Sequence, residues 1–213
     1  MDIVLIGAGG HGRVVLDILR HSRNNNIVGF LDADPTLAGT SIDGVEVLGP
    51  VNLLPKLKQK KVRGAIVSIG DNRTRRMYAS EVVAAGLELV TAFHPAATMA
   101  PGVELGQNVV VCAGAILCLG VSVGDHSILN TACVVDHECV IGPAVHVCPG
   151  ALLAGRVTVG AEAFIGLGAM VIQCLKIGAG ATIGAGAVVI RDVSAGAKIV
   201  GVPGREIGIV GSN

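Results

Sequence analysis

Residues 136–138, Asp136-His137-Glu138, place a histidine between two acids in a stretch that is otherwise apolar. Histidine is the side chain best placed to take up a proton at neutral pH, and a neighbouring carboxylate raises its basicity and holds its tautomer. The pattern therefore favours a general base at His137 with Glu138 as its partner, while a solvated surface histidine is the alternative. General-base help is worth about 10²- to 10⁴-fold in rate. Asp136 is either part of this group or a turn-forming residue.

The elements that hold these residues are short and repeat every six residues. From Val103 to Lys198 the chain divides into sixteen six-residue blocks without an insertion, and the third residue of fifteen blocks is a branched aliphatic. This period is typical of a solenoid in which each block is one short strand plus a turn, and three blocks close a triangular coil. Eighteen residues then form one coil, and coils stack about 4.8 Å apart.

His146 lies nine residues after His137, which is half a coil. It therefore falls on a different side of the triangular prism, and the two histidines can meet across a subunit boundary. Outward apolar residues such as Val109 and Val145 favour packing against other copies, and closed three-fold symmetry suits a triangular section. We expect a homotrimer whose grooves take a histidine from each wall.

In the first 95 residues, strand-like and helix-like patterns of apolar residues alternate, as is typical of an α/β domain. About four strands are expected, with helices on the faces of a small parallel sheet. The expected strands are 3–6, 27–31, 65–69 and one near 87–91; the helices are one whose buried face holds Val14, Val15, Ile18 and Leu19, and one over 74–85. The predicted fold class is therefore α/β plus β-solenoid, with a Rossmann-like domain at 1–95 and a β-helix with a short C-terminal tail at 96–213.

The loop between the first strand and helix reads GAGGHG, residues 7–12, and satisfies G-x-G-x-x-G, with Asp32 about twenty residues on. That is the dinucleotide fingerprint, which would predict a dehydrogenase. A sheet of about four strands followed by a solenoid argues against it. The glycine amides and helix dipole still form an anion site, so a nucleotide diphosphate attached to another group fits equally well. His11 and Arg73 are expected at this crevice, and a ligand-free tight turn is the alternative.

Composition limits the partners. The chain has 213 residues, and its sixteen basic and sixteen acidic residues cancel, so nothing favours nucleic acid or an anionic membrane. No signal peptide or membrane span is expected. The six cysteines lack C-x-x-C spacing and are expected as small buried residues in a reducing cytoplasm. His and Asp could form a metal site, but their spacing matches no known metal-binding motif, so no metal is expected.

The whole chain resembles the hexapeptide-repeat sugar acyltransferases, the family of sialic acid O-acetyltransferases and UDP-4-amino-sugar N-acetyltransferases. The motifs that carry the resemblance are IGAGGHG, FLD and IGDNRTRR in the first half, and HPAA, LNTACVVDHECVIGPAVHVCPGALLAG and GVPGR in the second. The resemblance implies a left-handed parallel β-helix. It also implies acetyl-CoA as co-substrate between adjacent β-helices of a trimer, and the sugar nucleotide on the α/β domain.

Carried over by position, the resemblance assigns His137 as the catalytic base and Glu138 as the residue that raises its basicity. It assigns acetyl-CoA contacts to His146, Gly155, Leu167 and Asn130, and nucleotide-sugar contacts to Gly9, Gly10, His11, Asp32, Gly70 and Arg73. Gly155 is eighteen residues beyond His137, so spacing and family agree there. Some relatives carry an acid where this chain has Ala33, which leaves the nucleotide open.

The leading hypothesis is an acetyl-CoA-dependent N-acetyltransferase of glycan biosynthesis. It would act by direct transfer on a nucleotide-linked 4-amino-4,6-dideoxy sugar. No serine or cysteine nucleophile is evident, which disfavours a covalent acyl-enzyme. O-acetylation of a sugar such as sialic acid is the alternative, and a non-catalytic solenoid that binds a nucleotide sugar as a regulator is a third hypothesis.

Overall fold

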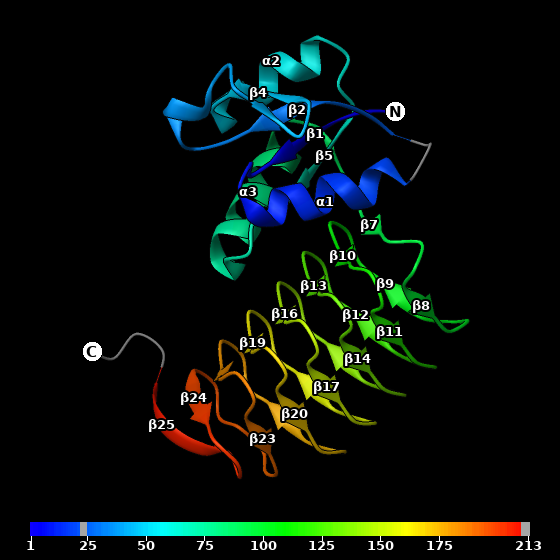
Figure 1. The fold of residues 1–213 in the computed structure, drawn as a ribbon, viewed down its shortest axis with the longest axis vertical. Coiled ribbons are helices and arrows are strands. Elements are labelled where there is room, and N and C mark those ends of the chain that lie inside the picture. Colours follow the sequence, from blue (N-terminus) through cyan, green and yellow to red (C-terminus); the bar gives the residue numbers. More distant parts are fainter. Residues whose placement is uncertain (22–24, 210–213) are drawn as a thin grey trace. The chain divides into compact units, whose positions relative to one another are not determined.

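The computed structural model describes residues 1–21 and 25–209. They form two compact units, Met1–His94 and Pro95–Asn213 (Figure 1). In the described residues no helix is long and apolar enough to cross a membrane. The predicted fold class, a Rossmann-like unit followed by a β-helix, is confirmed.

The first unit is a sheet with helices on its faces. The sheet order is β3-β4-β2-β1-β5-β6, parallel except for the β3–β4 pair. Its elements are β1 (Asp2–Ile6), α1 (Gly10–Arg20), β2 (Asn26–Leu31), β3 (Ser41–Ile42), β4 (Val45–Gly49), α2 (Leu54–Gln59), β5 (Gly64–Val67), α3 (Asn72–Ala84), β6 (Glu88–Leu89) and β7 (Ala92–Phe93), with short 3₁₀ turns at Pro35–Leu37 and Val51–Leu53.

The expected count of about four strands is wrong, because β3 and β4 form a hairpin that the apolar runs do not show. The turn between them is Asp43-Gly44, with φ of 48° and 80°. Two positive φ values are what a type I′ turn needs, and Asp-Gly is a strong signal for it. The strand count is therefore no argument against a dinucleotide site.

Helix α1 packs its apolar face on the sheet, with Val15, Leu16, Ile18 and Leu19 buried. The prediction for this face is wrong at one position, since Val14 is exposed and Leu16 takes its place. Strand β1 is buried from Ile3 onward and β5 throughout, as expected for parallel strands covered on both faces.

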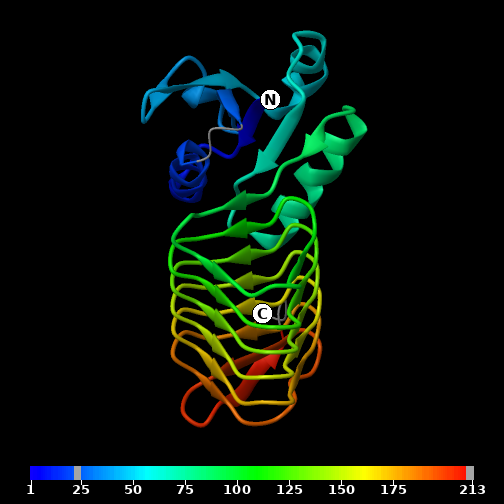
Figure 2. The same ribbon diagram turned by 90° about the vertical axis from the view of Figure 1, so that its right-hand side faces the viewer.

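The second unit is a left-handed parallel β-helix, whose coils appear as stacked rungs in Figure 2. Each strand from β8 (Thr98–Met99) to β20 (Met170–Val171) pairs with the strand eighteen residues further on, as in Val134↔Leu152 and Ile116↔Val134. The unbroken six-residue register predicted as far as Lys198 is wrong in the last coil, which is two residues shorter, since Thr182 pairs with Lys198. The predicted eighteen-residue coil is confirmed. The two-residue strands are β8 (Thr98–Met99), β9 (Glu104–Leu105), β10 (Val110–Val111), β11 (Ile116–Leu117), β12 (Ser122–Val123), β13 (Ile128–Leu129), β14 (Val134–Val135), β15 (Val140–Ile141), β16 (His146–Val147), β17 (Leu152–Leu153), β18 (Thr158–Val159), β19 (Phe164–Ile165), β20 (Met170–Val171), β21 (Lys176–Ile177), β22 (Thr182–Ile183) and β23 (Val188–Val189).

These strands form the three faces of the prism. We call them the β14 face (β8, β11, β14, β17, β20, β23), the β15 face (β9, β12, β15, β18, β21) and the β16 face (β10, β13, β16, β19, β22, with β24 and β25). The last two strands are β24 (Ala197–Val200) and β25 (Arg205–Ile209). They pair antiparallel, so β25 covers the edge that a further coil would occupy.

Every block turns its corner with the same backbone. The sixth residue of each block from 108 to 186 has a positive φ, and eight of these fourteen residues are not glycine. The third residue of each block points inward, and with the first it builds a continuous aliphatic core. The expectation that Val109 and Val145 point outward is wrong, since both are first residues of their blocks and are fully buried. The outward side chains and the corners are therefore the parts of the coil that can carry chemistry.

Candidate active site

His137 lies at the corner between β14 and β15, on the edge that joins the β14 and β15 faces. The Asp136 carboxylate accepts a hydrogen bond from the His137 backbone N–H, with Oδ1 2.7 Å from that nitrogen. Asp136 is therefore a turn residue that holds the backbone of this corner, which is the simpler of its two sequence interpretations.

The imidazole of His137 hydrogen-bonds to its neighbour. Nδ1 lies 3.2 Å from Oε2 of Glu138, and both side chains are at least half exposed. An ionised carboxylate can only accept, so Nδ1 is the donor and Nε2 of the neutral ring has a lone pair. The pair therefore presents Nε2 as the basic atom.

Gly155 occupies the same corner one coil further along, and the His137 ring lies against it. An ideal Cβ at Gly155 would lie 2.4 Å from Nε2 of His137 and 2.5 Å from Cε1. Atoms cannot approach this closely, so any side chain at Gly155 would displace the ring. Below Gly155 the corner continues with Gln173 and Arg191 at the same block position.

Glu138 has a φ of 57°, in the left-handed region. At the same block position on this edge the preceding coil has Gly120, with φ 73°. Glutamate costs more than glycine in this conformation because its Cβ crowds the following carbonyl. A carboxylate is thus kept beside the base where the backbone favours glycine.

A second polar cluster lies on the edge that joins the β16 and β14 faces. Nδ2 of Asn130 is 3.0 Å from Nε2 of His146, and Oδ1 of Asn130 accepts from the Thr131 N–H at 2.8 Å. The second bond orients the amide, so Asn130 donates to Nε2 and the proton of a neutral His146 lies on Nδ1. His146 is buried and meets Phe164 edge-on at 5.3 Å between ring centroids.

The structure therefore brings His137, Glu138 and Gly155 together, and Asn130 with His146, but on two different edges of one prism. Leu167 lies at a corner of the second edge and is 58% exposed. The β14 face separates the two edges. As the half-coil spacing predicts, the two histidines do not share a side within one chain.

In the first unit, a cleft of about 300 Å³ opens beside the glycine loop. Its lining includes Gly7, Gly9, His11, Asp32, Ala33, Ser68, Thr74 and Tyr78. Gly10 borders a second hollow, together with Arg13 and Asp43, and Gly9 lines both. The cleft is at the lower end of the size range of small-molecule sites.

The glycines of the loop have different tasks. A Cβ at Gly12 would lie 2.1 Å from the Gly7 carbonyl oxygen, so Gly12 lets α1 approach the loop, whereas ideal Cβ atoms at Gly9 and Gly10 meet nothing within 4 Å. Open space at the N-terminus of α1 is what a bound phosphate needs.

Asp32 braces this loop. Its Oδ2 accepts from the Ala8 N–H at 2.7 Å and its Oδ1 from the Asp34 N–H at 2.9 Å. Each carboxylate oxygen can accept more than one bond, so Asp32 can still contact a ligand at the cleft that it lines.

Arg73 is exposed, and α3 supplies Thr74 and Tyr78 to the cleft. Sequence reasoning missed the fully buried Arg75 two residues later. Its Nη1 donates to the carbonyls of Ile69 and Gly70 at 2.9 and 3.0 Å, and burial lowers its pKa to about 10. It stays charged at neutral pH and holds the turn that leads into α3. Nothing in the run NRTRR distinguishes the buried arginine from the exposed ones.

Comparison with known proteins agrees with both units. The model of the PglD N-terminal domain family matches residues 2–82. The GDP-perosamine N-acetyltransferase of Escherichia coli O157:H7 is 31% identical over 172 residues, covering 79% of this chain and 77% of that protein. The chain belongs to the hexapeptide-repeat sugar N-acetyltransferase family.

Solved structures of this family superimpose closely on the chain. A histidine mutant of perosamine N-acetyltransferase from Caulobacter crescentus, in complex with CoA and GDP-perosamine, has a TM-score of 0.94 and 41% identity, covering 98% of this chain and 97% of that one. The acetyltransferase domain of PglB from Neisseria gonorrhoeae, in complex with acetyl coenzyme A, has a TM-score of 0.90 and 36% identity, covering 97% and 98%. The predicted membership of the hexapeptide-repeat sugar acyltransferases is thus confirmed.

Proposed function

We propose that this chain transfers the acetyl group of acetyl-CoA to the amino group of a nucleotide-linked 4-amino-4,6-dideoxy sugar. The observation that carries the proposal is the His137–Glu138 pair, which presents Nε2 over Gly155 on the edge of the β-helix. The relatives solved with CoA and GDP-perosamine share 40–41% of their residues with this chain, so a GDP-linked amino sugar is the first substrate to try.

In the proposed reaction the sugar nitrogen attacks the thioester carbonyl directly. Nε2 of His137 accepts a proton from the nitrogen as the C–N bond forms, and the Glu138 carboxylate balances the charge on the imidazolium. Collapse of the tetrahedral intermediate breaks the C–S bond, and the proton held by His137 passes to the departing thiolate. The products are the N-acetylated sugar nucleotide and CoA with a free thiol.

The coenzyme would lie along the same edge as His137. Arg191 is 54 residues beyond His137, which is three coils, or about 14 Å. A hollow of about 210 Å³ there is lined by Arg191 and Arg205, together with the acidic residues Asp192 and Glu206. We infer that the phosphates of CoA contact these guanidinium groups while the pantetheine arm passes Gly155.

The β14 face supports a trimer with sites between subunits. Its outward side chains form an apolar column, and the exposed members Ile116, Leu152 and Met170 are each about two-fifths exposed. In contrast, the β15 face presents polar residues such as Glu104, Thr158 and Lys176. Three copies with their β14 faces toward a common axis would bring His137 of one chain to Asn130 and His146 of the next. His146, Asn130 and Leu167 would then contact the acetyl-CoA held in that groove.

Mixing two inactive variants tests this arrangement. His137→Ala and His146→Ala are each expected to be inactive alone. In trimers assembled at random from equal amounts, about a quarter of the sites combine an intact His137 with an intact His146 from the neighbour. Recovery of about that fraction of wild-type activity supports the shared site, whereas no recovery contradicts it.

The nucleotide sugar would occupy the cleft of the first unit. Gly9 and Gly10 would receive the diphosphate at the N-terminus of α1, with His11 and Asp32 beside it. Gly70 and Arg73 remain proposed contacts from the start of α3. We place the enzyme in the cytoplasm because both proposed substrates are metabolites of that compartment.

Release of the CoA thiol, followed over a panel of acceptors, tests the function. The panel holds GDP-, UDP- and dTDP-linked 4-amino sugars and free sialic acid, with His137→Ala as the control. We expect release with an amino-sugar nucleotide and none with sialic acid. Release with sialic acid alone would make the chain an O-acetyltransferase. Nucleotide-sugar binding without release would leave a non-catalytic regulator, and release that survives His137→Ala would remove the mechanism.

A further inference from the structure

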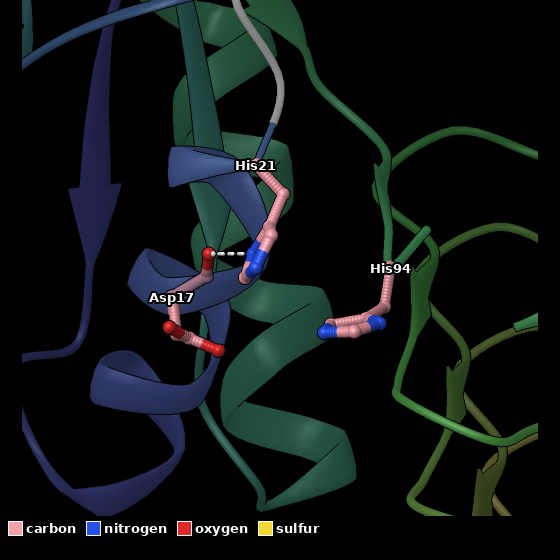
Figure 3. A group of neighbouring side chains, drawn as sticks. All are labelled: Asp17, His21 and His94. Atoms are coloured by element: carbon pink, nitrogen blue, oxygen red, sulfur yellow. Dashed lines mark hydrogen bonds between the residues drawn. The ribbon is translucent and has the colours of Figure 1, made fainter. Parts of the chain in front are cut away.

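Three side chains that can bind a metal ion gather at the C-terminal end of α1. They are Asp17 and His21 of the helix and His94, which follows β7, all within the first unit. One ligand atom from each lies within 4.8 Å of the other two. Figure 3 shows the His94 ring directed toward the two side chains of α1.

The backbone places these ligands side by side. Asp17 and His21 are four residues apart on one helix and therefore share a face. The rings of His21 and His94 have their centroids 5.0 Å apart and are tilted by 54°. Two tilted imidazoles at this separation can direct one nitrogen each to a common point.

A hydrogen bond fixes the tautomer of His21 that can bind a metal ion. Nδ1 lies 2.9 Å from the backbone carbonyl oxygen of Asp17 (Figure 3). A carbonyl only accepts, so Nδ1 carries the proton and the lone pair is on Nε2. Histidines that bind metals usually donate their other N–H to a carbonyl or carboxylate in this way.

We propose that Asp17, His21 and His94 bind a divalent transition metal ion, with Zn²⁺ as the best match. Two imidazoles and one carboxylate are ligands that zinc takes, with a fourth position left to water. Tetrahedral ligands about 2.0–2.1 Å from zinc lie about 3.4 Å from one another. Asp17 is exposed, so rotation of its side chain can bring the carboxylate to the ion while His21 keeps its hydrogen bond. The C-terminal dipole of α1 also favours a cation here.

The metal would be structural and would take no part in the acetyl transfer. Helix α1 has eleven residues, which puts this end about 16 Å from the glycine loop at its other end. The ion would fasten the end of α1 to the segment after β7. A sequence motif cannot reveal this metal site, because His94 is 73 residues from His21 and joins the other two ligands only through folding.

Metal titration of the full chain tests the proposal without an activity assay. After treatment with a chelator, the protein is titrated with Co²⁺, followed by visible absorption, and Co²⁺ is then displaced with Zn²⁺. The test variants are Asp17→Asn, His21→Gln and His94→Gln. The control is His126→Asn, since His126 has a φ of 63° that asparagine tolerates.

We expect one Zn²⁺ per chain, weakened at least about tenfold in each test variant and unchanged in the control. Zn²⁺ should raise the Tm of the wild type and of the control but not of the test variants. Circular dichroism shows whether each variant is folded. Equal affinity in all variants, no saturable binding to the wild type, or a thiolate charge-transfer band that puts the ion on a cysteine would each overturn the proposal.

Discussion

The imidazole of His137 packs closely against Gly155, where an ideal Cβ would lie 2.4 Å from Nε2. The two residues are eighteen apart in the chain and stack at one corner of successive coils. Gly155 therefore sets the position of the proposed base, in addition to any contact that it makes with the coenzyme.

Gly155→Ala is expected to lower kcat by about 10- to 100-fold, because an error of about 1 Å in placing a catalytic group has that effect. Steady-state kinetics separates the two roles of this glycine. A displaced base lowers kcat, whereas a lost coenzyme contact alone raises KM for acetyl-CoA. Ala179→Ser is the control, since Ala179 is exposed and lies at the same block position on another edge. Unchanged kcat in Gly155→Ala would contradict the positioning role.

Glu138 should reveal a conflict between stability and activity. Both Glu138→Gln and Glu138→Gly remove the carboxylate and should lower kcat by about 10-fold or more. Glu138→Gly should also raise the free energy of unfolding by about 1 kcal/mol, because glycine has no Cβ and adopts the left-handed conformation without steric strain. Urea denaturation measures the second effect.

The control for this pair is Glu162→Gly, at the same block position on another edge, with φ 60°. It should keep full activity. A Glu138→Gly variant as active as wild type would exclude the carboxylate from the mechanism.

Cys174 reports where the coenzyme lies. It is exposed, so the expectation that the cysteines are buried is wrong at this position. It lies 36 residues, or two coils, beyond Glu138 on the proposed path. Burial raises the pKa of the Cys112, Cys133 and Cys148 thiols to about 12, so these stay protonated and react slowly. Mass spectrometry after brief alkylation should find Cys174 labelled first. Saturating CoA should slow that labelling, and unchanged labelling would place the coenzyme on another edge.

Leu152→Glu should break the proposed trimer. It puts a charge in the middle of the apolar column of the β14 face, where association would bury it without a partner. Light scattering should show monomers, with activity reduced at least about tenfold although His137 is intact. The control is Thr158→Glu, whose side chain points outward on the β15 face. It should change neither the oligomeric state nor the activity. A trimeric, active Leu152→Glu variant would place the interface elsewhere.

The positions of residues in the fold follow most reliably from the sequence where the chain is periodic. In the β-helix, residues eighteen apart are neighbours, so the proximity of His137 and Gly155 and the separation of His146 follow from counting. In the α/β unit, prediction from the sequence failed at the β3–β4 hairpin and at Val14. The Asp43-Gly44 turn could have revealed the hairpin, whereas the burial of Leu16 depends on how α1 lies on the sheet.

The fold class, the coil length and the residues that share an edge can be predicted from the sequence, because a strict six-residue repeat converts sequence separation directly into spatial position. The hydrogen bonds that those residues make are apparent only in the folded structure. It showed Asp136 and Asp32 as braces of their turns, Arg75 as buried, and His94 beside Asp17. The contacts of Asp32 with Ala8 and of His94 with Asp17 join segments without a common period, and long-range packing of side chains selects them.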